Sequence, residues 1–459
     1  MELFKAIMST FGAAIMLPIL IFIFELCLRV KPMKAFKSAI YIGIGLNGLL
    51  AILNPYFLGL MGNAVSDMVL SGGIQLPYVD TGWGVLAALS YSTTIGAMII
   101  PVGIVVNLIL LRFGMTDTLN IDIWNFWHWA FIGTMIYYGT GNYALGLVAA
   151  VVMQLFSLLL ADITGPTMRK FFNLPGLSFP HGTMLGGTLI GLLLRWPLEK
   201  LGIMKIQVNS ETIRRKLGPL GDSVVIGFLV AVIIGFIAWS GKLTDMATWA
   251  GIIRLGIGTG AFIYLYPKAT GALLEGFRTL SDRVREILME KGTKREINFG
   301  MDGALCVGHP DAITTGLLSM IVAVGMVFFL PGNRFLMLAN LGVTPFFLAA
   351  GIVAVMGGNI VASLIATSAA LAVTFYFSTA ISPIFNTIAT QIGGIDVVHG
   401  AALVGADIRP LHGISFYIGQ NWITVSVAVV VLLGVMYAIK VKPMLKEKLS
   451  GYKEEQLTK

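Results

Sequence analysis

Long hydrophobic runs separated by short polar connections dominate the chain. Runs at 6–28 and 39–61 are each long enough for one bilayer crossing, which takes about 20 residues. A longer run at 83–111 contains Pro101, which predicts a kink. Further runs cover 224–239, 247–266 and 422–439. Together, these runs and the remaining apolar stretches predict roughly ten to twelve membrane-embedded segments in an all-α polytopic membrane protein.

Two stretches rich in glycine and proline interrupt this pattern. One is 173–194, which begins NLPGLSFPHGTMLGG, and the other is 355–378, which begins VMGGNIVASLI. Short apolar stretches of this kind are typical of re-entrant hairpins rather than full crossings. Broken segments at corresponding places in two halves of a chain indicate a binding site between inverted repeats. We find no convincing residue-level repeat, so the symmetry is a hypothesis.

Composition and charge support a membrane protein and indicate its orientation. Of 459 residues, 56% are hydrophobic and 12% charged, against about 25% charged in an ordinary soluble domain. The net charge of +8 does not indicate nucleic-acid binding, because the basic residues lie in short loops and in the tail at 440–459. Basic clusters at 29–37 and in the tail predict a cytoplasmic location for both, with the N-terminus outside and the C-terminus in the cytoplasm.

Two long polar segments leave alternatives open. The segment 268–300 mixes both charges and predicts an amphipathic helix at the cytoplasmic surface, either a docking face for a soluble partner or a solvated connector. The segment 391–421 predicts an external loop. Its acidic and basic side chains have spacings that match no metal site, so we expect neither metal nor cofactor. They are Asp396, His399, Asp407, Arg409 and His412.

The strongest chemical signal is the stretch GMDGALCVGHPD at 300–311. An ionisable residue at bilayer depth costs at least a few kcal/mol, so Asp302 and His309 are functional-site candidates. They lie seven positions apart, on one face of a regular helix, although the glycines and Pro310 indicate a broken helix. The alternative is a cytoplasmic loop that joins two spans.

Polar groups beside aromatic rings provide a second signal. Asn125 and His128 are three positions apart in a tryptophan-rich segment, an arrangement typical of a polyol or sugar pocket. The alternative is an interfacial aromatic belt. His181, in the first glycine-rich stretch, is either a ligand-binding residue or a structural hydrogen-bond donor.

Four longer motifs resemble one known family. They are NIDIWNFWH at 120–128, FPHGT at 179–183, IRRKLGPLGDSVVIGF at 213–228 and MDGALCVGHPDA at 301–312. Together they resemble the galactitol-type IIC permease of the bacterial phosphoenolpyruvate-dependent phosphotransferase system, in the ascorbate/galactitol superfamily. The likeness is collinear over nearly the whole chain.

The resemblance implies a fold and an assembly. It implies a homodimeric carrier of galactitol or a related polyol in the bacterial inner membrane, with eleven spans, two re-entrant hairpins and inverted repeats. A transport core would slide against a scaffold, as in an elevator mechanism. Within one integral-membrane domain, 1–459, the scaffold would comprise 1–112 and 213–300, and the core 118–195 and 301–380.

The resemblance also implies site residues and partners. The pocket would contain Asn125, His128, His181, Asp302, His309, Asp311 and Asn359. A phosphocysteine on a separate IIB subunit, supplied by IIA, HPr and Enzyme I, would phosphorylate the sugar, so the chain is a permease subunit rather than the phosphoryl-transfer enzyme. Our own hypothesis is that Asp302 or His309 acts as the general base.

Two other classes of function remain as alternatives. An ion-coupled secondary transporter would suit the same broken helices and buried carboxylate. An intramembrane enzyme would need a recognisable catalytic constellation, and we find none.

Overall fold

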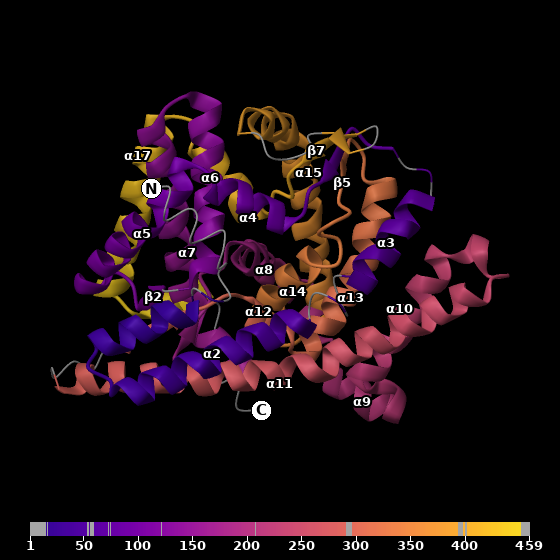
Figure 1. Cartoon of the computed structure of the whole chain (residues 1–459), viewed down its shortest axis with the longest axis horizontal. Helices are drawn as coiled ribbons and strands as arrows, with labels where there is room; N and C mark the ends of the chain where they lie inside the picture. The colour runs from indigo at the N-terminus through magenta and orange to yellow at the C-terminus, as the bar shows by residue number, and fades with distance from the viewer. Residues whose placement is uncertain are drawn as a thin grey trace.

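The computed structural model describes residues 15, 17–52, 55, 59–71, 73, 75–120, 122–206, 208–290, 296–392, 398–399 and 402–450, and in these ranges the chain is mostly helical (Figure 1). Buried apolar side chains form two clusters. One surrounds the helices within 246–290 and 310–392, and the other surrounds those within 123–172.

The elements fall into two halves joined by a short surface helix, α9 (Ser210–Leu217). The first half contains α2 (Pro32–Ile52), α3 (Leu60–Ser71), β1 (Tyr78–Asp80), α4 (Trp83–Tyr91), α5 (Thr94–Arg112), β2 (Thr118–Asn120), α6 (Ile123–Thr140), α7 (Tyr143–Phe172), β3 (Leu177–Ser178) and α8 (Gly182–Lys200). The second half contains α10 (Ser223–Ala238), α11 (Met246–Glu290), β4 (Asn298–Gly300), α12 (Ala304–Val307), α13 (Pro310–Phe329), β5 (Phe335–Leu336), α14 (Thr344–Val355), α15 (Ile360–Ile392), β6 (Val398–His399), β7 (Ala402–Gly405), α16 (Pro410–Ile418), α17 (Trp422–Val441) and α18 (Met444–Ser450).

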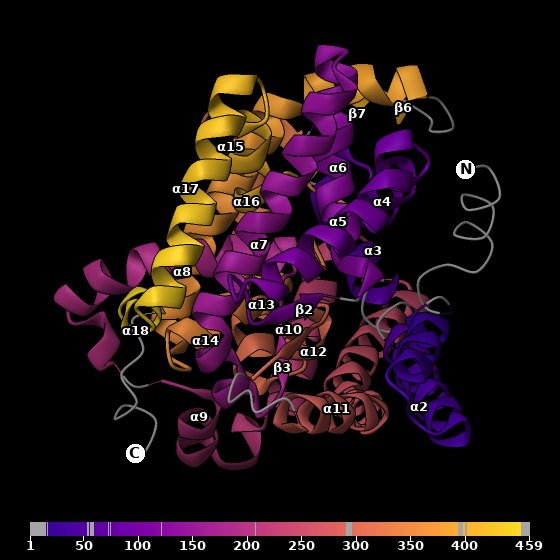
Figure 2. The same cartoon turned by 90° about the vertical axis from the view of Figure 1, so that its left-hand side faces the viewer.

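Two small sheets, which the hydrophobic pattern did not predict, join the halves. Their strand orders are β5-β1-β7-β6 and β2-β4-β3, and every pair except β6 with β7 is parallel. Each sheet takes its central strand from one half, β1 or β4, and the strands on both sides of it from the other half. Exchanging β1 with β4, β2 with β5 and β3 with β7 converts one three-stranded core into the other. The two halves therefore repeat each other in topology, and the sheets lie at different levels of the molecule (Figure 2).

Helices α2 and α11 lie side by side along one edge of the molecule (Figure 1). Glycines permit their close approach: a Cβ at Gly45 would stand 2.6 Å from the Leu273 Cα, and one at Gly276 would stand 2.8 Å from the Ile42 nitrogen. The helix expected within 268–300 is present as the last part of α11, which continues without a break from its apolar part to Glu290. Its place at the cytoplasmic surface stays a prediction.

Within the part of the chain that the structure describes, seven helices are long and apolar enough to cross a membrane. They are Pro32–Ile52, Thr94–Arg112, Tyr143–Phe172, Met246–Leu280, Pro310–Phe329, Ile360–Ile392 and Trp422–Val441, and the described residues also include shorter apolar helices at Leu17–Cys27, Val224–Ala238 and Thr344–Val355. This agrees with a polytopic membrane protein, whereas the count of eleven spans stays a prediction.

Several boundaries differ from those expected. The second helix begins at Pro32 and ends at Ile52 rather than covering 39–61. The run 83–111 breaks between α4 and α5, where the Thr93 hydroxyl accepts a hydrogen bond from the Gly96 amide at 3.1 Å, while Pro101 lies inside α5.

The two glycine-rich stretches form different local structures. Residues 173–194 comprise β3 and the first part of α8, which continues to Lys200. Residues 355–378 comprise a turn and the first part of α15, and the turn contains Gly357 and Gly358 at φ values of 63° and 81°. Whether either stretch re-enters the membrane stays a prediction.

Candidate functional site

A cavity lies where the six parallel strands of the two sheets end. Its empty volume is about 850 Å³, which includes the open solvent at its mouth. Ligands bind beyond the carboxyl ends of parallel strands in many folds, because the chain turns into a helix there and exposes polar groups. Each strand contributes to the lining: Trp83 follows β1, Asp122 and Trp124 follow β2, His181 and Thr183 follow β3, Asp302 and Ala304 follow β4, Thr344 and Phe347 follow β5, and Arg409 follows β7.

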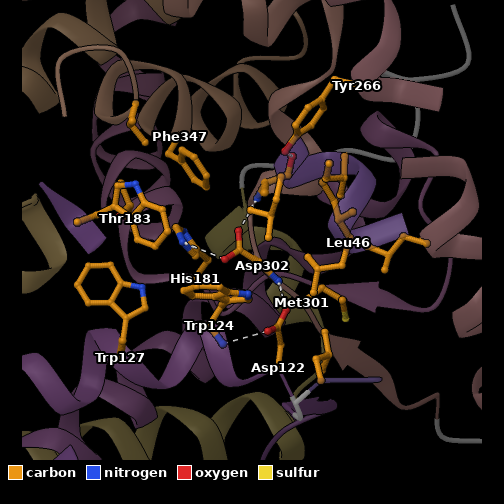
Figure 3. A pocket seen from close by; sticks show the side chains of 18 of the residues that line it. Leu46, Asp122, Trp124, Trp127, His181, Thr183, Tyr266, Met301, Asp302 and Phe347 are labelled. Carbon is orange, nitrogen blue, oxygen red and sulfur yellow. Dashed lines mark hydrogen bonds and ion pairs between the residues drawn. The ribbon is translucent and has the colours of Figure 1, made fainter. Parts of the chain in front are cut away.

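The other wall of the cavity is aliphatic. It comes from the helix at 17–27, from α2 and from α11, and its leucines are Leu17, Leu46, Leu49, Leu50 and Leu273. Leu46 stands on the side of the cavity away from the histidine and the tryptophans (Figure 3). The cavity therefore lies between the α2–α11 pair and the body that contains both sheets.

Helix N-termini meet at this cavity, because α4, α6, α8, α12, α14 and α16 each begin just after a strand. Side chains accept hydrogen bonds from some of the first N–H groups: Asp122 Oδ1 from Trp124 at 3.0 Å, His181 Nδ1 from Met184 at 3.3 Å, and Asp302 Oδ1 from Ala304 at 2.7 Å. The positive ends of the helix dipoles favour electron-rich ligand atoms such as hydroxyl oxygens.

The side chains of Asp302 and His181 lie next to each other in the cavity lining, with Asp122 below (Figure 3). Asp302 Oδ2 lies 3.7 Å from His181 Nε2, and the Asp302 amide donates to Asp122 Oδ2 at 2.9 Å. The His181 ring also lies 5.0 Å from the Phe347 ring, with the planes inclined by 31°. The β2, β3, β4 and β5 ends are thus linked at one point.

Burial shifts the pKa values of Asp122, His181 and Asp302, which lie in connections outside the candidate membrane spans. Burial raises the pKa of Asp122, and the nearby Asp302 carboxyl raises it further. Burial also raises the pKa of Asp302 above that of an exposed aspartate. Burial lowers the pKa of His181, and the Arg409 charge lowers it further, so the imidazole is neutral at pH 7. A neutral imidazole beside a carboxyl group offers both acceptors and a donor to hydroxyls.

Asn125 and His128 stand behind the cavity wall rather than in it. Both are fully buried; Asn125 Nδ2 donates to Asn120 Oδ1 at 2.8 Å, and His128 Nδ1 lies 2.9 Å from His412 Nε2. The His128 ring packs edge-on against the His181 ring with centroids 4.5 Å apart. His128 is therefore placed to orient His181.

His309, Asp311 and Asn359 do not line the cavity; they lie around the segment that leads into α9. Asp311 Oδ1 accepts a hydrogen bond from the Ser210 amide at 2.6 Å, and Asn359 Nδ2 donates to the Ile206 carbonyl at 2.8 Å. His309 caps α13 by accepting from the Asp311 amide at 3.3 Å. The contacts of Asp311 and Asn359 are those of groups that hold a surface segment on the helices.

The sequence analysis missed Arg409. The expected external loop at 391–421 is wrong for its described part, because Asp407, Arg409 and His412 are 0%, 2% and 0% exposed. Asp396, from the same segment, lies outside the described residues. The rule that an ionisable residue in an apolar chain marks a site, which selected Asp302, would also have selected Arg409.

Comparisons with known proteins identify the family. A family model described as "PTS system sugar-specific permease component" matches residues 6–398. The chain is 30% identical over 385 residues to a galactitol-specific EIIC component of the PTS system from Escherichia coli K12, covering 84% of this chain and 83% of that protein. The corresponding protein of Escherichia coli O157:H7 is similar to the same extent. A third relative, from the K12 strain, is 30% identical over 396 residues and is described only as a permease IIC component.

The match covers most of the chain, and the relatives are covered to more than two thirds of their length. The predicted resemblance is thereby confirmed at the level of the family. The chain belongs to the family of sugar-specific permease components of the phosphotransferase system.

Proposed function

We propose that the chain carries galactitol or a closely related polyol across the membrane for phosphorylation by a partner IIB subunit. The observation that carries this proposal is the cavity at the ends of six strands, which combines aromatic rings with Asp302, His181 and Thr183. Two similar proteins are named as galactitol-specific. A ligand of that class suits the cavity.

A polyol has no charge but many hydroxyls, and each hydroxyl needs a hydrogen-bond partner once water is removed. In the proposed complex, Asp302 accepts from one hydroxyl and Thr183 accepts or donates. His181 donates from Nε2, because its Nδ1 already accepts a hydrogen bond from the Met184 amide. Trp124, Trp127 and Phe347 line the same cavity and would pack against the carbon chain. Of the seven residues that the resemblance implied, we therefore assign direct contact to Asp302 and His181.

The proposed chemical step is phosphoryl transfer to a hydroxyl of the bound polyol. The hydroxyl oxygen forms a bond to the phosphorus of the IIB phosphocysteine, the sulfur–phosphorus bond breaks, and the thiolate leaves. The proton of the hydroxyl passes to the Asp302 carboxylate as general base. We favour Asp302 over His309 because Asp302 lines the cavity. IIB, with IIA, HPr and Enzyme I behind it, is therefore a required partner.

The proposed movement takes place between the α2–α11 pair and the rest of the molecule. The resemblance implied a scaffold of 1–112 and 213–300 and a core of 118–195 and 301–380. We propose instead that β1 and β4 move with the core, because each of them is paired with a core strand. The leucine wall of the cavity supports this division, because aliphatic side chains form no directional bonds and permit sliding. We infer a homodimer in the bacterial inner membrane, with the N-terminus outside and the C-terminus in the cytoplasm.

Uptake of labelled galactitol tests the proposal. Inverted vesicles or proteoliposomes containing the chain are supplied with phosphoenolpyruvate, Enzyme I, HPr and the cognate IIA and IIB, and the product is separated into free and phosphorylated sugar. Phosphorylated galactitol that disappears when IIB alone is omitted supports the proposal.

The other outcomes of the same assay are equally informative. Free galactitol that accumulates on a proton or sodium gradient without the donor chain would establish the ion-coupled alternative. If galactitol is not taken up while another hexitol or pentitol is, the substrate assignment changes and the carrier function stands. If no polyol is taken up with the full donor chain present, the proposal is refuted.

A further inference from the structure

Arg409 is a buried cation that no part of the proposed transfer step uses. It follows β7, immediately precedes α16 and lines the cavity while only 2% exposed. Its Nε and Nη1 atoms have no hydrogen-bond partner among the residues that the structure describes. An arginine normally uses most of its five N–H donors when it is buried. Nε and Nη1 together carry three of them, and three unused donors beside a cavity indicate that a ligand completes the set.

The guanidinium is held firmly at its other end. Its Nη2 lies 2.9 Å from Asp407 Oδ2, and the same carboxylate oxygen accepts a hydrogen bond from the Thr344 hydroxyl. The Arg409 Cζ also lies 5.6 Å from the centroid of the Trp127 ring. These contacts come from the β5 and β7 ends and from α6, so the charge has a fixed position when the cavity is empty.

The surroundings favour a neutral ligand at this position. The Asp407 carboxylate already balances the Arg409 charge, and Asp302 and Asp122 line the same cavity. An added anion would meet these carboxyl groups, whereas hydroxyl oxygens accept hydrogen bonds from a guanidinium without adding charge. The planar fork of a guanidinium suits two acceptor oxygens on neighbouring atoms, and a polyol carries hydroxyls on neighbouring carbons.

We propose that Arg409 is a substrate-binding residue, which donates the hydrogen bonds that Asp407 leaves free to two neighbouring hydroxyl oxygens of the polyol. The inference rests on the proposed function and extends it, since it gives the pocket a second polar anchor besides Asp302 and His181. It makes Arg409 a determinant of specificity for polyols with intact neighbouring hydroxyls.

The test measures the affinity of the purified, reconstituted full chain for galactitol and for each monodeoxy-galactitol by titration calorimetry. Because a lost hydrogen bond to a charged donor reduces affinity by about tenfold or more, at least one monodeoxy analogue should bind the parent protein that much more weakly. Arg409→Lys keeps the charge and removes the fork. It should bind galactitol about as weakly as the parent binds that analogue, with no further loss for the analogue itself.

Two further variants separate binding from folding. Arg409→Gln combined with Asp407→Asn removes both buried charges together, so no charge is left without a partner. Like Arg409→Lys, this double variant should bind galactitol no more tightly than the affected monodeoxy analogue. Arg334→Gln is the matched control, because Arg334 is also close to an aromatic ring, Tyr78, but is exposed and does not line the cavity. It should keep the parent affinities.

The outcomes distinguish this inference from the proposed function. If the parent protein binds every monodeoxy analogue with the same affinity as galactitol, the inference is overturned, even if no variant folds. A folded Arg409 variant with unchanged affinities also overturns it, because internal water would then satisfy the free donors of Arg409. If the parent protein binds galactitol phosphate more tightly than galactitol, and Arg409→Lys loses this difference, the ligand of Arg409 is an anion and the proposed hydroxyl contact is overturned. A parent that binds no polyol refutes the proposed function as well.

Discussion

The close contact between α8 and α14 makes a sharp prediction, because each of these helices carries cavity residues. His181 caps α8 and Thr183 lies in its first turn, whereas Thr344 and Phe347 lie in the first turn of α14. At Gly187, in the middle of α8, an added Cβ would stand 2.8 Å from the Leu348 Cα and 2.9 Å from the Leu348 carbonyl carbon. Both are backbone atoms, which cannot rotate away.

The magnitude follows from these distances. Carbon atoms in contact are normally about 3.5 Å apart, so Gly187→Ala must separate the two helices by about 0.7 Å. Overpacking of this kind costs about 1 to 3 kcal/mol, against which alanine regains about 1 kcal/mol of helix propensity over glycine. Because a displacement near 1 Å at a site costs roughly a hundredfold in rate, we expect at least about a tenfold loss of galactitol phosphorylation.

The matched control is Gly325→Ala in α13, where an added Cβ meets no atom within 4 Å. It has the same gain in helix propensity without the collision and should be neutral or slightly stabilising. Thermal unfolding in detergent and PEP-dependent phosphorylation in vesicles are measured for both variants. If Gly187→Ala and Gly325→Ala behave alike in both assays, the contact between α8 and α14 does not position the site as argued.

Three further predictions concern individual polar residues. Asp302→Asn should spare galactitol binding and stop its phosphorylation, and equal loss of both would exclude the general-base role. Burial raises the pKa of Asp302, and only the carboxylate form accepts a proton. The phosphorylation rate of the parent protein should therefore rise with pH at values above 4, which is about the pKa of an exposed aspartate. A rate that already reaches its plateau at about pH 4 would contradict the general-base role. His309→Gln should keep the phosphorylation rate within about a few-fold of the parent, because His309 does not line the cavity, and a loss as large as that of Asp302→Asn would restore it as a base. Asp311→Asn should speed amide hydrogen exchange at 208–212 and leave galactitol affinity unchanged, whereas a lost affinity with unchanged exchange would place Asp311 at the substrate.

The hydrophobic pattern was sufficient for some features of the site. Apolar runs predict a polytopic membrane protein because every backbone group in a bilayer must be paired within a helix. Asp302 and His181 are recognisable because an ionisable group in apolar surroundings needs a reason to be there. Both line the cavity.

Other features depend on contacts that no local pattern contains. The strands have only two to four residues, and β7 lies beside β1 across more than 300 positions of the sequence. Without that pairing, the segment around Arg409 has the glycine and polar content of a loop. Asp311 is only nine positions from Asp302, but the N-terminus of α13 intervenes and Asp311 holds the segment before α9 instead. Proximity in sequence was therefore a poor guide to membership of the pocket.

The arrangement of the two sheets explains why the pocket needs both halves of the chain. Each sheet has its central strand from one half and its outer strands from the other, so neither half alone completes a sheet. The chemically distinct groups are divided in the same way: Asp302 and Arg409 belong to the second half, and Asp122 and His181 to the first. The Asp302 amide donates to Asp122, and the Arg409 guanidinium lies over Trp127, so each half orients groups of the other. A movement that separated the halves would dismantle the site, so the proposed transport movement would have to carry both sheets together past the leucine wall of α2 and α11.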